Sequence, residues 1–595
     1  PKLTEAHNNL GIAFKELGKL DDAFRCYQMA LNINPNYAEA LLNIGFIHHK
    51  RGKLDESIKC YLQTLSIKPD YAEAHNNLGN VLMDLGQLDE AVINFKLAIS
   101  IEPNYAQAHN NYGIVLDTLG HQSAADKSYK KAISIKPNYA AAYANHAELL
   151  TDLKQFDEAL LSFKYAIKLN PNIDFALGNF LHTKMHLCIW DNLSIHLKEI
   201  QEKVISREKV IGPFSLLALI DDPELQKIAA DTYISEMHPK IQYLSKLKIN
   251  SKYKKIRVGY FSADFREHPV SALTVELYES HNRDKFEIYA FSFGPDTKDE
   301  MNLRIKAGVD HFYDVHTMPH KDVANLSRSM KIDIAINLGG HTRDSRTGIF
   351  AMQAAPIQVN YLGYPGTMGG DYMDYLIADH ELIPKDKQHC YSEKIVYLPN
   401  SYMVNDTKNK VSKRVFSREE CGLPSDGFIF CCFNNHYKIT PDIFIRWMRI
   451  LSKVDGSILW LPEGNNIANK NLKIQAEKNN IDESRIIFAQ RLNLREEHLK
   501  RIQLADLFLD TTPYNAHATT SDALQMGLPV LTFKGNSFVS RVASSLIKSV
   551  NLSELITTTL EQYESLAIQL AKNPKELKTI KEKLFNNLPN SPLYD

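Results

Sequence analysis

Several short polar segments of this 595-residue chain carry side chains that could bind a phosphorylated substrate. Residues 510–522 read DTTPYNAHATTSD and lie between an apolar run and a second apolar stretch. Where a strand leads into a helix, free backbone N–H groups at the helix start bind phosphate oxygens, so this segment predicts a diphosphate site. We expect the helix to start near Ala523. Asp522 could then accept hydrogen bonds from ribose hydroxyls.

Two further segments place single ionisable side chains after apolar runs. Lys438 precedes a predicted helix start at 440–441, and its ammonium group could neutralise charge that grows on a departing phosphate. His268 follows the apolar run 256–260 and could position an acceptor or take its proton. Each residue taken alone is more often a solvated surface lysine or a structural histidine. Their shared position after predicted strands favours the chemical interpretation.

The motifs that are absent from the sequence favour a reaction without a metal or a cofactor. Sugar-nucleotide enzymes that hold the diphosphate through a metal usually carry Asp-x-Asp, and the sequence has none. A lysine and helix N-termini would then stabilise the leaving group. P-loop, His-Glu-x-x-His and Gly-x-Gly-x-x-Gly motifs are also missing. The seven cysteines form no Cys-x-x-Cys pair, so we expect reduced, structural thiols.

Alternating apolar runs and helical stretches must position these segments. The runs lie at 256–260, 286–291, 332–338, 357–362, 428–433, 457–461, 485–488, 507–510 and 530–532. Such alternation predicts two parallel sheets in series, with ligands bound beyond the carboxyl ends of the strands. We assign residues 251–406 to an N-terminal Rossmann-like lobe and residues 407–595 to a C-terminal lobe that binds the nucleotide.

A repeat of 34 residues occupies the N-terminal part of the chain. It is marked by Pro35, Pro69, Pro103, Pro137 and Pro171. This period is typical of tetratricopeptide repeats, helix pairs that stack into an α-solenoid. We assign residues 1–182 to the repeat array and 183–250 to a helical connector, with helices expected over 182–202 and 224–247. Residue 1 lies within a repeat's first helix, so the sequence is compatible with further repeats upstream.

One column of the repeat offers amide side chains at the same interval. Its members are Asn9, Asn43, Asn77, Asn111, Asn145 and Asn179. They lie on the first helix of each unit, which lines the inner groove of such solenoids. Because an amide has one acceptor and two donors, the column could clamp an extended polypeptide whatever its sequence. The alternative is that asparagine is merely common and solvated at this position.

Composition narrows the classes of partner. The formal net charge is −1, from 69 basic and 70 acidic residues, which predicts neither nucleic-acid nor membrane-surface binding. No apolar run approaches the roughly 20 residues that span a bilayer, and no signal-peptide pattern opens the chain. We expect a cytoplasmic protein whose partners are polypeptides and a small nucleotide.

Taken together, the motifs resemble those of the protein O-linked N-acetylglucosamine transferase family. The matching strings lie at 258–260 (VGY), 264–269 (DFREHP), 362–367 (LGYPGT), 433–438 (FNNHYK), 496–498 (EEH), 517–522 (HATTSD) and 540–546 (SRVASSL). The resemblance covers nearly the whole chain and implies a repeat solenoid followed by twin lobes of the GT-B type. It also implies an inverting, metal-independent transfer of N-acetylglucosamine from UDP-GlcNAc to Ser or Thr hydroxyls of polypeptides in the repeat groove.

The resemblance also implies roles for individual residues. Lys438 would stabilise the leaving diphosphate, and His268 would lie beside the acceptor hydroxyl. Which group takes the acceptor proton stays open, with a donor phosphate oxygen as a candidate. The implied substrate-binding residues are Asn435, Thr519 and Thr520 for the diphosphate, Asp522 for the ribose, Arg495, His498 and Arg501 for the uridine, and His517, Leu362 and Gly363 for the sugar.

The chain departs from the animal members of that family in ways that affect the donor prediction. Arg495 stands where they have lysine and Asn435 where they have glutamine, and the stretch 401–415 is too short for their extra domain, so we expect a bacterial-type member. Gly340-His341-Thr342 also occurs in plant-type protein O-fucosyltransferases, which use a GDP-sugar, and we include His341 in the donor site. The alternatives are therefore an O-fucosyltransferase, a glucosyltransferase of the same fold, or a catalytically silent repeat scaffold.

Overall fold

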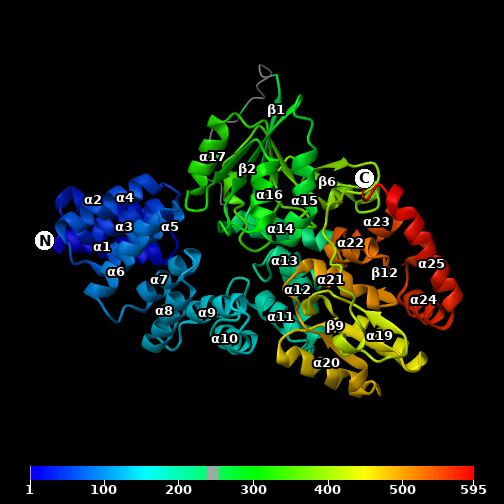
Figure 1. The fold of residues 1–595 in the computed structure, drawn as a ribbon. Helices are drawn as coiled ribbons and strands as arrows, with labels where there is room; N and C mark the ends of the chain where they lie inside the picture. Colours follow the sequence, from blue (N-terminus) through cyan, green and yellow to red (C-terminus); the bar gives the residue numbers. More distant parts are fainter. Residues whose placement is uncertain (1, 238–246, 248–253, 595) are drawn as a thin grey trace. The chain divides into compact units, whose positions relative to one another are not determined.

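A computed structural model describes residues 2–237, 247 and 254–594 of the chain. It divides into two compact units, one formed largely by residues 1–173 and the other by most of the rest. Figure 1 shows the residues of the repeat helices in blue to cyan and those that follow from cyan-green to red. Among the described residues, every helix is too short or too polar to cross a bilayer.

The first unit is a series of helix pairs, as the repeat predicted. The pairs are α1 (Lys2–Glu16) with α2 (Leu20–Ile33), α3 (Ala38–Lys50) with α4 (Leu54–Ile67), α5 (Ala72–Asp84) with α6 (Leu88–Ile101), α7 (Ala106–Thr118) with α8 (Gln122–Ile135), and α9 (Ala140–Asp152) with α10 (Phe156–Leu169). A glycine in the first helix allows close approach of the second. A Cβ atom added at Gly79 would lie 2.7 Å from the Phe95 ring, and Gly45 stands in the same relation to Tyr61.

The connector belongs to the second unit and contains α11 (Ala176–His186), α12 (Leu193–Ile205), α13 (Pro213–Leu217) and α14 (Pro223–Met237). The single helix expected over 182–202 is wrong, because Cys188 and Asn192 have φ values of 52° and 57° and interrupt it. The helix expected over 224–247 is described only to Met237, and Leu247 is not helical. The rest of that helix, and the start of the predicted N-terminal lobe at 251–253, lie outside the described residues.

The N-terminal lobe is built on a parallel sheet with the strand order β3-β2-β1-β4-β5-β6-β7. Its strands are β1 (Ile256–Ser262), β2 (Phe286–Ser292), β3 (His311–Asp314), β4 (Ile334–Asn337), β5 (Ile357–Asn360), β6 (Tyr375–Ala378) and β7 (Lys394–Tyr397). The helices between them are α15 (Pro269–Ser280), α16 (Glu300–Gly308), α17 (His320–Ser329) and α18 (Gly348–Ala351). Strand order reverses at β1 and β4, where Val258 pairs with both Ile288 and Ile334.

The C-terminal lobe repeats this topology in the order β10-β9-β8-β11-β12-β13. Its strands are β8 (Ile429–Cys431), β9 (Ile458–Pro462), β10 (Ile486–Ala489), β11 (Leu507–Leu509), β12 (Val530–Phe533) and β13 (Ile556–Thr557). Its helices are α19 (Pro441–Lys453), α20 (Asn466–Lys478), α21 (Arg495–Arg501), α22 (Ala518–Gln525), α23 (Val542–Ser549), α24 (Leu560–Lys572) and α25 (Pro574–Asn587). The twin Rossmann-like architecture is therefore confirmed, and each sheet has a switch point, at β1/β4 and β8/β11, beyond which ligands bind in such folds.

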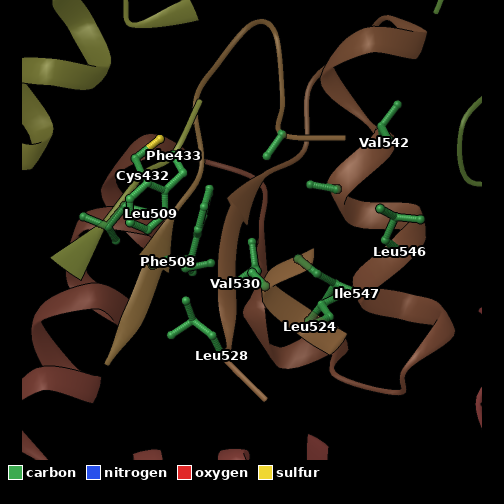
Figure 2. Close-up of a cluster of buried hydrophobic side chains, with 14 of the residues drawn as sticks. Cys432, Phe433, Phe508, Leu509, Leu524, Leu528, Val530, Val542, Leu546 and Ile547 are labelled. Atoms are coloured by element: carbon green, nitrogen blue, oxygen red, sulfur yellow. The ribbon is translucent and has the colours of Figure 1, made fainter. Parts of the chain in front are cut away.

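A dry core supports the second switch point. Figure 2 shows Phe508 and Val530, from the neighbouring strands β11 and β12, gathered with Leu524 of α22 and Ile547 of α23. These side chains are almost fully buried. The loops that leave the strands above them are consequently anchored to a close-packed base.

Polar contacts hold the two lobes together within the second unit. Ser545 of α23 donates its hydroxyl to Asp379, which follows β6, at 2.6 Å. Glu381 accepts from Lys534, after β12, at 2.8 Å. The carboxylates of one lobe thus fix the position of the other.

Candidate active site

Lys438 is buried where two loops of the C-terminal lobe meet. It ends a short 3₁₀ helix, His436–Lys438, between β8 and α19, and is 8% exposed. Its Nζ donates a hydrogen bond to the carbonyl of Asn515 at 3.1 Å and lies 3.8 Å from the ring centroid of Tyr514. Asn515 and Tyr514 belong to the loop after β11, so the structure brings Lys438 against the 510–522 segment.

Burial changes the protonation of the side chains in this site. Burial lowers the pKa of Lys438 to about 8, while the nearby Asp510 acts in the opposite direction. Burial and the charge of Lys438 lower the pKa of His517 well below its ordinary value, so that imidazole is neutral at pH 7. An ammonium group in such a place can interact strongly with an anion because little water screens it.

Helix α22 begins earlier than the sequence suggested, at Ala518 rather than near Ala523. His517 therefore occupies the residue before the helix, where its Nε2 is 3.3 Å from the carbonyl oxygen of Val539. The first N–H groups of a helix have no acceptor within it, and Ala518 and Thr519 supply them here. The helix start thus offers backbone donors beside Lys438.

The two threonines predicted to bind the diphosphate are placed differently. The Thr519 hydroxyl donates to Asn434 Oδ1 at 2.7 Å and is half-buried. The Thr520 hydroxyl is fully buried and donates to the Ala516 carbonyl at 2.9 Å, while its N–H donates to His517 O. Thr519 consequently faces the loop after β8, whereas Thr520 is turned into the helix.

Asp522 and Arg495 form an ion pair between α22 and α21. Arg495 Nη2 donates to Asp522 Oδ1, and Arg495 Nη1 donates to Asn409 Oδ1 at 2.9 Å. Burial raises the pKa of Asp522, and the Arg495 guanidinium opposes this. The carboxylate predicted for ribose and the cation predicted for uracil are therefore already adjacent.

His498 and Arg501 occupy the same face of α21, as their spacing indicated. The Arg501 Nε donates to His498 Nδ1 at 3.2 Å, and the His498 ring meets the edge of Phe433 with centroids 5.2 Å apart. Arg501 is 6% exposed and also donates to the carbonyl of Gln490. It lies behind His498 and orients that ring.

Sequence reasoning missed Asn434 and emphasised its exposed neighbour Asn435. Asn434 is buried, and its Nδ2 donates to the Thr511 hydroxyl at 2.7 Å while its Oδ1 accepts from Thr519. It also missed Asp510, which is 1% exposed. Asn434 directly follows the predicted strand 428–433 and Asp510 ends the predicted strand 507–510, and that position was the available signal.

His268 precedes α15 in the N-terminal lobe. Its Nδ1 accepts a hydrogen bond from the N–H of Val270 at 3.3 Å and lies 3.5 Å from Asp264 Oδ2. Burial lowers the pKa of His268, and Asp264 opposes this. A lone pair held on Nδ1 places the proton of the neutral ring on Nε2, which can then donate to an acceptor oxygen.

The remaining N-terminal candidates lie in the loops after β4 and β5. Leu362 has a φ of +68°, a conformation rare for a branched residue and often found at functional sites. A Cβ atom on Gly363 would lie 1.8 Å from the Leu338 carbonyl oxygen. His341 Nε2 is 2.7 Å from the Met368 carbonyl oxygen, and its ring packs edge-on against Tyr364.

Ionisable groups of the two lobes influence one another at two points. Burial raises the pKa of Tyr514 well above its ordinary value, with further contributions from other tyrosines that include Tyr364. Burial likewise raises the pKa of Glu267, next to His268, and Arg495 opposes this shift. Both lobes therefore contribute to the electrostatics of the candidate residues.

Members of the asparagine column donate hydrogen bonds to a second asparagine position of the preceding repeat, and Asn43 uses its amide donors on Asn8 and on the carbonyl of Glu39. Asn111 Nδ2 donates to Asn76 Oδ1 at 3.1 Å, and Asn145 Nδ2 donates to Asn110 Oδ1 at 3.0 Å. Asn111 and Asn145 each keep a second amide N–H that can bind a ligand. The last member of the column, Asn179, lies in α11 of the second unit.

The possible metal ligands lie apart from these candidates in the chain, whereas Cys431 and Cys432 lie a few residues before Asn434 and Lys438. All seven cysteines are free thiols. Across the described ranges, one group of side chains has the composition and spacing to hold a metal ion, namely Glu224, His389 and Cys390. None of the predicted site residues belongs to it.

Comparison with known proteins relates both units to described families. The model of glycosyl transferase family 41 matches residues 229–416 and 410–595, and tetratricopeptide models match segments between residues 11 and 173. The probable UDP-N-acetylglucosamine–peptide N-acetylglucosaminyltransferase SEC of Arabidopsis thaliana is 36% identical over 438 residues, covering 70% of this chain and 44% of its own length. The Caenorhabditis elegans UDP-N-acetylglucosamine–peptide N-acetylglucosaminyltransferase is 27% identical, covering 58% and 39%.

This chain therefore spans less than half the length of these curated relatives. Among solved structures, a mutant of the Thermobaculum terrenum O-GlcNAc transferase is similar with a TM-score of 0.58 and 24% identity, covering 93% of each chain. At that identity the likeness concerns the fold.

Proposed function

We propose, because this chain belongs to glycosyl transferase family 41, that it transfers N-acetylglucosamine from UDP-GlcNAc to Ser or Thr hydroxyls of polypeptides. The observation that carries the proposal is the buried Lys438 ammonium beside the loop that leads into α22. The relatives' names, which specify a UDP-N-acetylglucosamine donor and a peptide acceptor, supply the substrate classes.

The chemistry assigned to the C-terminal lobe is stabilisation of the leaving group. As the bond between the sugar and the diphosphate breaks, negative charge grows on the phosphate oxygens. The N–H groups of Ala518 and Thr519 and the Lys438 ammonium would meet that charge with fixed positive potential. We propose that these groups do the work that a metal ion does in sugar-nucleotide enzymes carrying Asp-x-Asp.

The other C-terminal residues would recognise the nucleoside. Asp522 can accept hydrogen bonds from ribose hydroxyls while it keeps its bond to Arg495, since a carboxylate has several lone pairs. Arg495 and His498, on the first and second turns of α21, would contact the base. Arg501 would act through His498, because its own guanidinium is buried.

The acceptor hydroxyl would approach from the N-terminal lobe. His268, with Nε2 available as a donor, can orient the hydroxyl oxygen, which leaves a donor phosphate oxygen to take the proton. Leu362 and Gly363 would shape the space for the sugar, and His341 would support their loop through Tyr364. The polypeptide would be held by the amide side chains of the asparagine column in the repeats.

Nucleotide selectivity tests the donor assignment. We expect UDP, at a hundredfold excess over its Kd, to stabilise the protein by about 2.7 kcal/mol and so raise its Tm, and GDP to have little effect. Differential scanning fluorimetry with both nucleotides measures this. A shift with GDP alone would assign an O-fucosyltransferase instead, and no shift with either nucleotide would favour a scaffold without catalytic activity.

If the asparagine column binds the polypeptide, changes in it should affect acceptor binding without affecting hydrolysis of the donor. Alanine at both Asn111 and Asn145 removes two backbone-binding amides, so KM for a long peptide acceptor should rise by roughly tenfold, at about 0.5–1.5 kcal/mol per hydrogen bond. Hydrolysis of UDP-GlcNAc in the absence of acceptor should be unchanged. Asn104→Ala, in the exposed turn after α6, is the matched control. Equal losses in both reactions would instead indicate damage to the fold.

A further inference from the structure

Asp510 is a buried carboxylate that the reaction described above does not use. It directly follows β11 and is 1% exposed. Its Oδ1 accepts from the N–H groups of Thr511 at 2.8 Å and Ala516 at 2.6 Å, and its Oδ2 accepts from the Thr532 hydroxyl at 2.7 Å. The carboxylate therefore ties both ends of the loop 511–516 to the neighbouring strand β12.

That loop carries the contacts of Lys438. Its Asn515 carbonyl accepts from the Lys438 ammonium, and its Tyr514 ring lies against the same group. The Asn515 side chain in turn donates to the Thr511 carbonyl at 2.8 Å. Thr511 also donates its hydroxyl to the Tyr514 carbonyl, so both neighbours of Lys438 are bonded to Thr511, whose N–H is held by Asp510.

A second connection runs from Asp510 to the helix start. Asn434 Nδ2 lies 3.4 Å from Asp510 Oδ1 and 2.7 Å from the Thr511 hydroxyl. The Oδ1 of the same asparagine accepts from Thr519. Asp510 thus lies at the centre of the bonds that join the loop after β8, the loop after β11 and α22.

Asp510 also supplies charge. The other titratable groups around Lys438 are Cys432 directly after β8, Tyr437 beside it, Tyr514 in the loop and His517 before α22. Burial raises the pKa values of the thiol and both phenols and lowers that of the imidazole, so all of them are neutral at pH 7. Among these groups, a negative charge can come only from Asp510.

We propose that Asp510 is a positioning residue for Lys438: its carboxylate fixes the loop that orients the ammonium group and keeps that group protonated in a buried site. The role rests on the proposed function for its catalytic consequence. Burial raises the pKa of Asp510 itself to about 7, against its hydrogen bonds and Lys438, so its negative charge depends on the same neighbours that it holds.

Asp510→Asn removes the charge and keeps the shape. The amide oxygen can accept from Thr511 and Ala516, and the Nδ2 can donate to the Thr532 hydroxyl, which accepts as well as donates. In the wild type, kcat/KM for UDP-GlcNAc should fall as the pH rises through about 8, because the ammonium form is lost. In Asp510→Asn the Lys438 pKa falls further. The alkaline limb of the pH profile, where kcat/KM falls, should therefore move to lower pH by about one unit or more.

Two variants separate the charge from the shape. Thr532→Ser changes the packing beside the carboxylate but keeps the hydroxyl that donates to it, and therefore its charge, so the fall in kcat/KM should stay near the pH of the wild type. Lys438→Arg carries a guanidinium that stays protonated, so adding Asp510→Asn to it should move no limb. Circular dichroism and Tm identify any variant that fails to fold. A limb of Asp510→Asn that coincides with the wild type, with kcat/KM lowered equally at every pH, would overturn the charge role.

A measurement without any nucleotide distinguishes failure of this inference from failure of the proposed function. Trace acetylation of Lys438 with acetic anhydride from pH 6 to 10, read by peptide mass spectrometry, reports the neutral amine directly. The midpoint should lie at lower pH in Asp510→Asn than in the wild type, even if the protein binds neither UDP nor GDP. Identical midpoints would overturn the assignment whatever the donor.

Discussion

Replacement of Lys438 by alanine is expected to lower kcat for N-acetylglucosamine transfer by about 10²–10³-fold. This is the magnitude found when one preorganised donor is removed from a developing negative charge in a site shielded from water. Lys438 has these properties, since it is 8% exposed and fixed by Asn515 and Tyr514. Transfer of labelled sugar from UDP-GlcNAc to a peptide measures the rate. A separate binding measurement with UDP shows whether the variant still binds the nucleotide.

The control for this variant is a lysine of the same lobe that cannot take part. Lys453→Ala, at the exposed end of α19, should leave kcat unchanged. Lys438→Ala should also fold, because Asp510 can become protonated once its countercharge is lost. A rate equal to that of the wild type would remove Lys438 from the reaction and leave the helix start as the main stabilising element.

The substitution Gly363→Ala is expected to lower transfer by at least about 100-fold and to reduce Tm. The new Cβ would lie 1.8 Å from the Leu338 carbonyl oxygen, a backbone atom that cannot rotate away. The loop after β5 must therefore move, and overpacking of this kind typically costs about 1–3 kcal/mol or more. Movement of the loop also displaces Leu362 and Tyr364, which flank Gly363, and small displacements at a reacting centre lower rates steeply.

The neighbouring loop provides a matched control for that substitution. Gly339 follows β4, and a Cβ atom there would be 3.5 Å from its nearest neighbour, which is ordinary van der Waals contact. Gly339→Ala should accordingly retain both its Tm and most of its transfer activity. If both variants were equally active, the loop after β5 would have no part in the donor site.

The strands that the sequence predicted and those that it missed differ mainly in the strength of their apolar signal. Apolar runs identified β1, β2, β4 and β5 in the first sheet and β8 to β12 in the second. The missed strands are β3, β6, β7 and β13, and all of these except β6 lie at an edge of their sheet. Edge strands are short and partly exposed, as in β7 with its pattern of exposed and half-buried residues, so their apolar signal is weak.

The sequence placed the candidate residues at strand ends but could not decide which way each side chain turns. Asn434 rather than Asn435 is buried among the bonds to Thr511 and Thr519, and the Thr520 hydroxyl is turned into α22. Arg501 is likewise buried behind His498. These differences depend on where a helix begins and on which neighbour offers an acceptor, and both are set by contacts between segments far apart in the chain.

The sequence by itself determined the repeat array, the two parallel sheets and the clustering of polar residues beyond β8 and β11, because periodicity and apolar runs are local properties that each segment carries alone. Only the tertiary structure decided that Lys438 is buried against Asn515 and that Asp522 is paired with Arg495. It also decided that Asp510 holds the loop 511–516, which carries Asn515. Burial and hydrogen-bond partners come from the other strands, loops and helices that surround a residue, and it is those surroundings that give a common lysine or aspartate its unusual pKa.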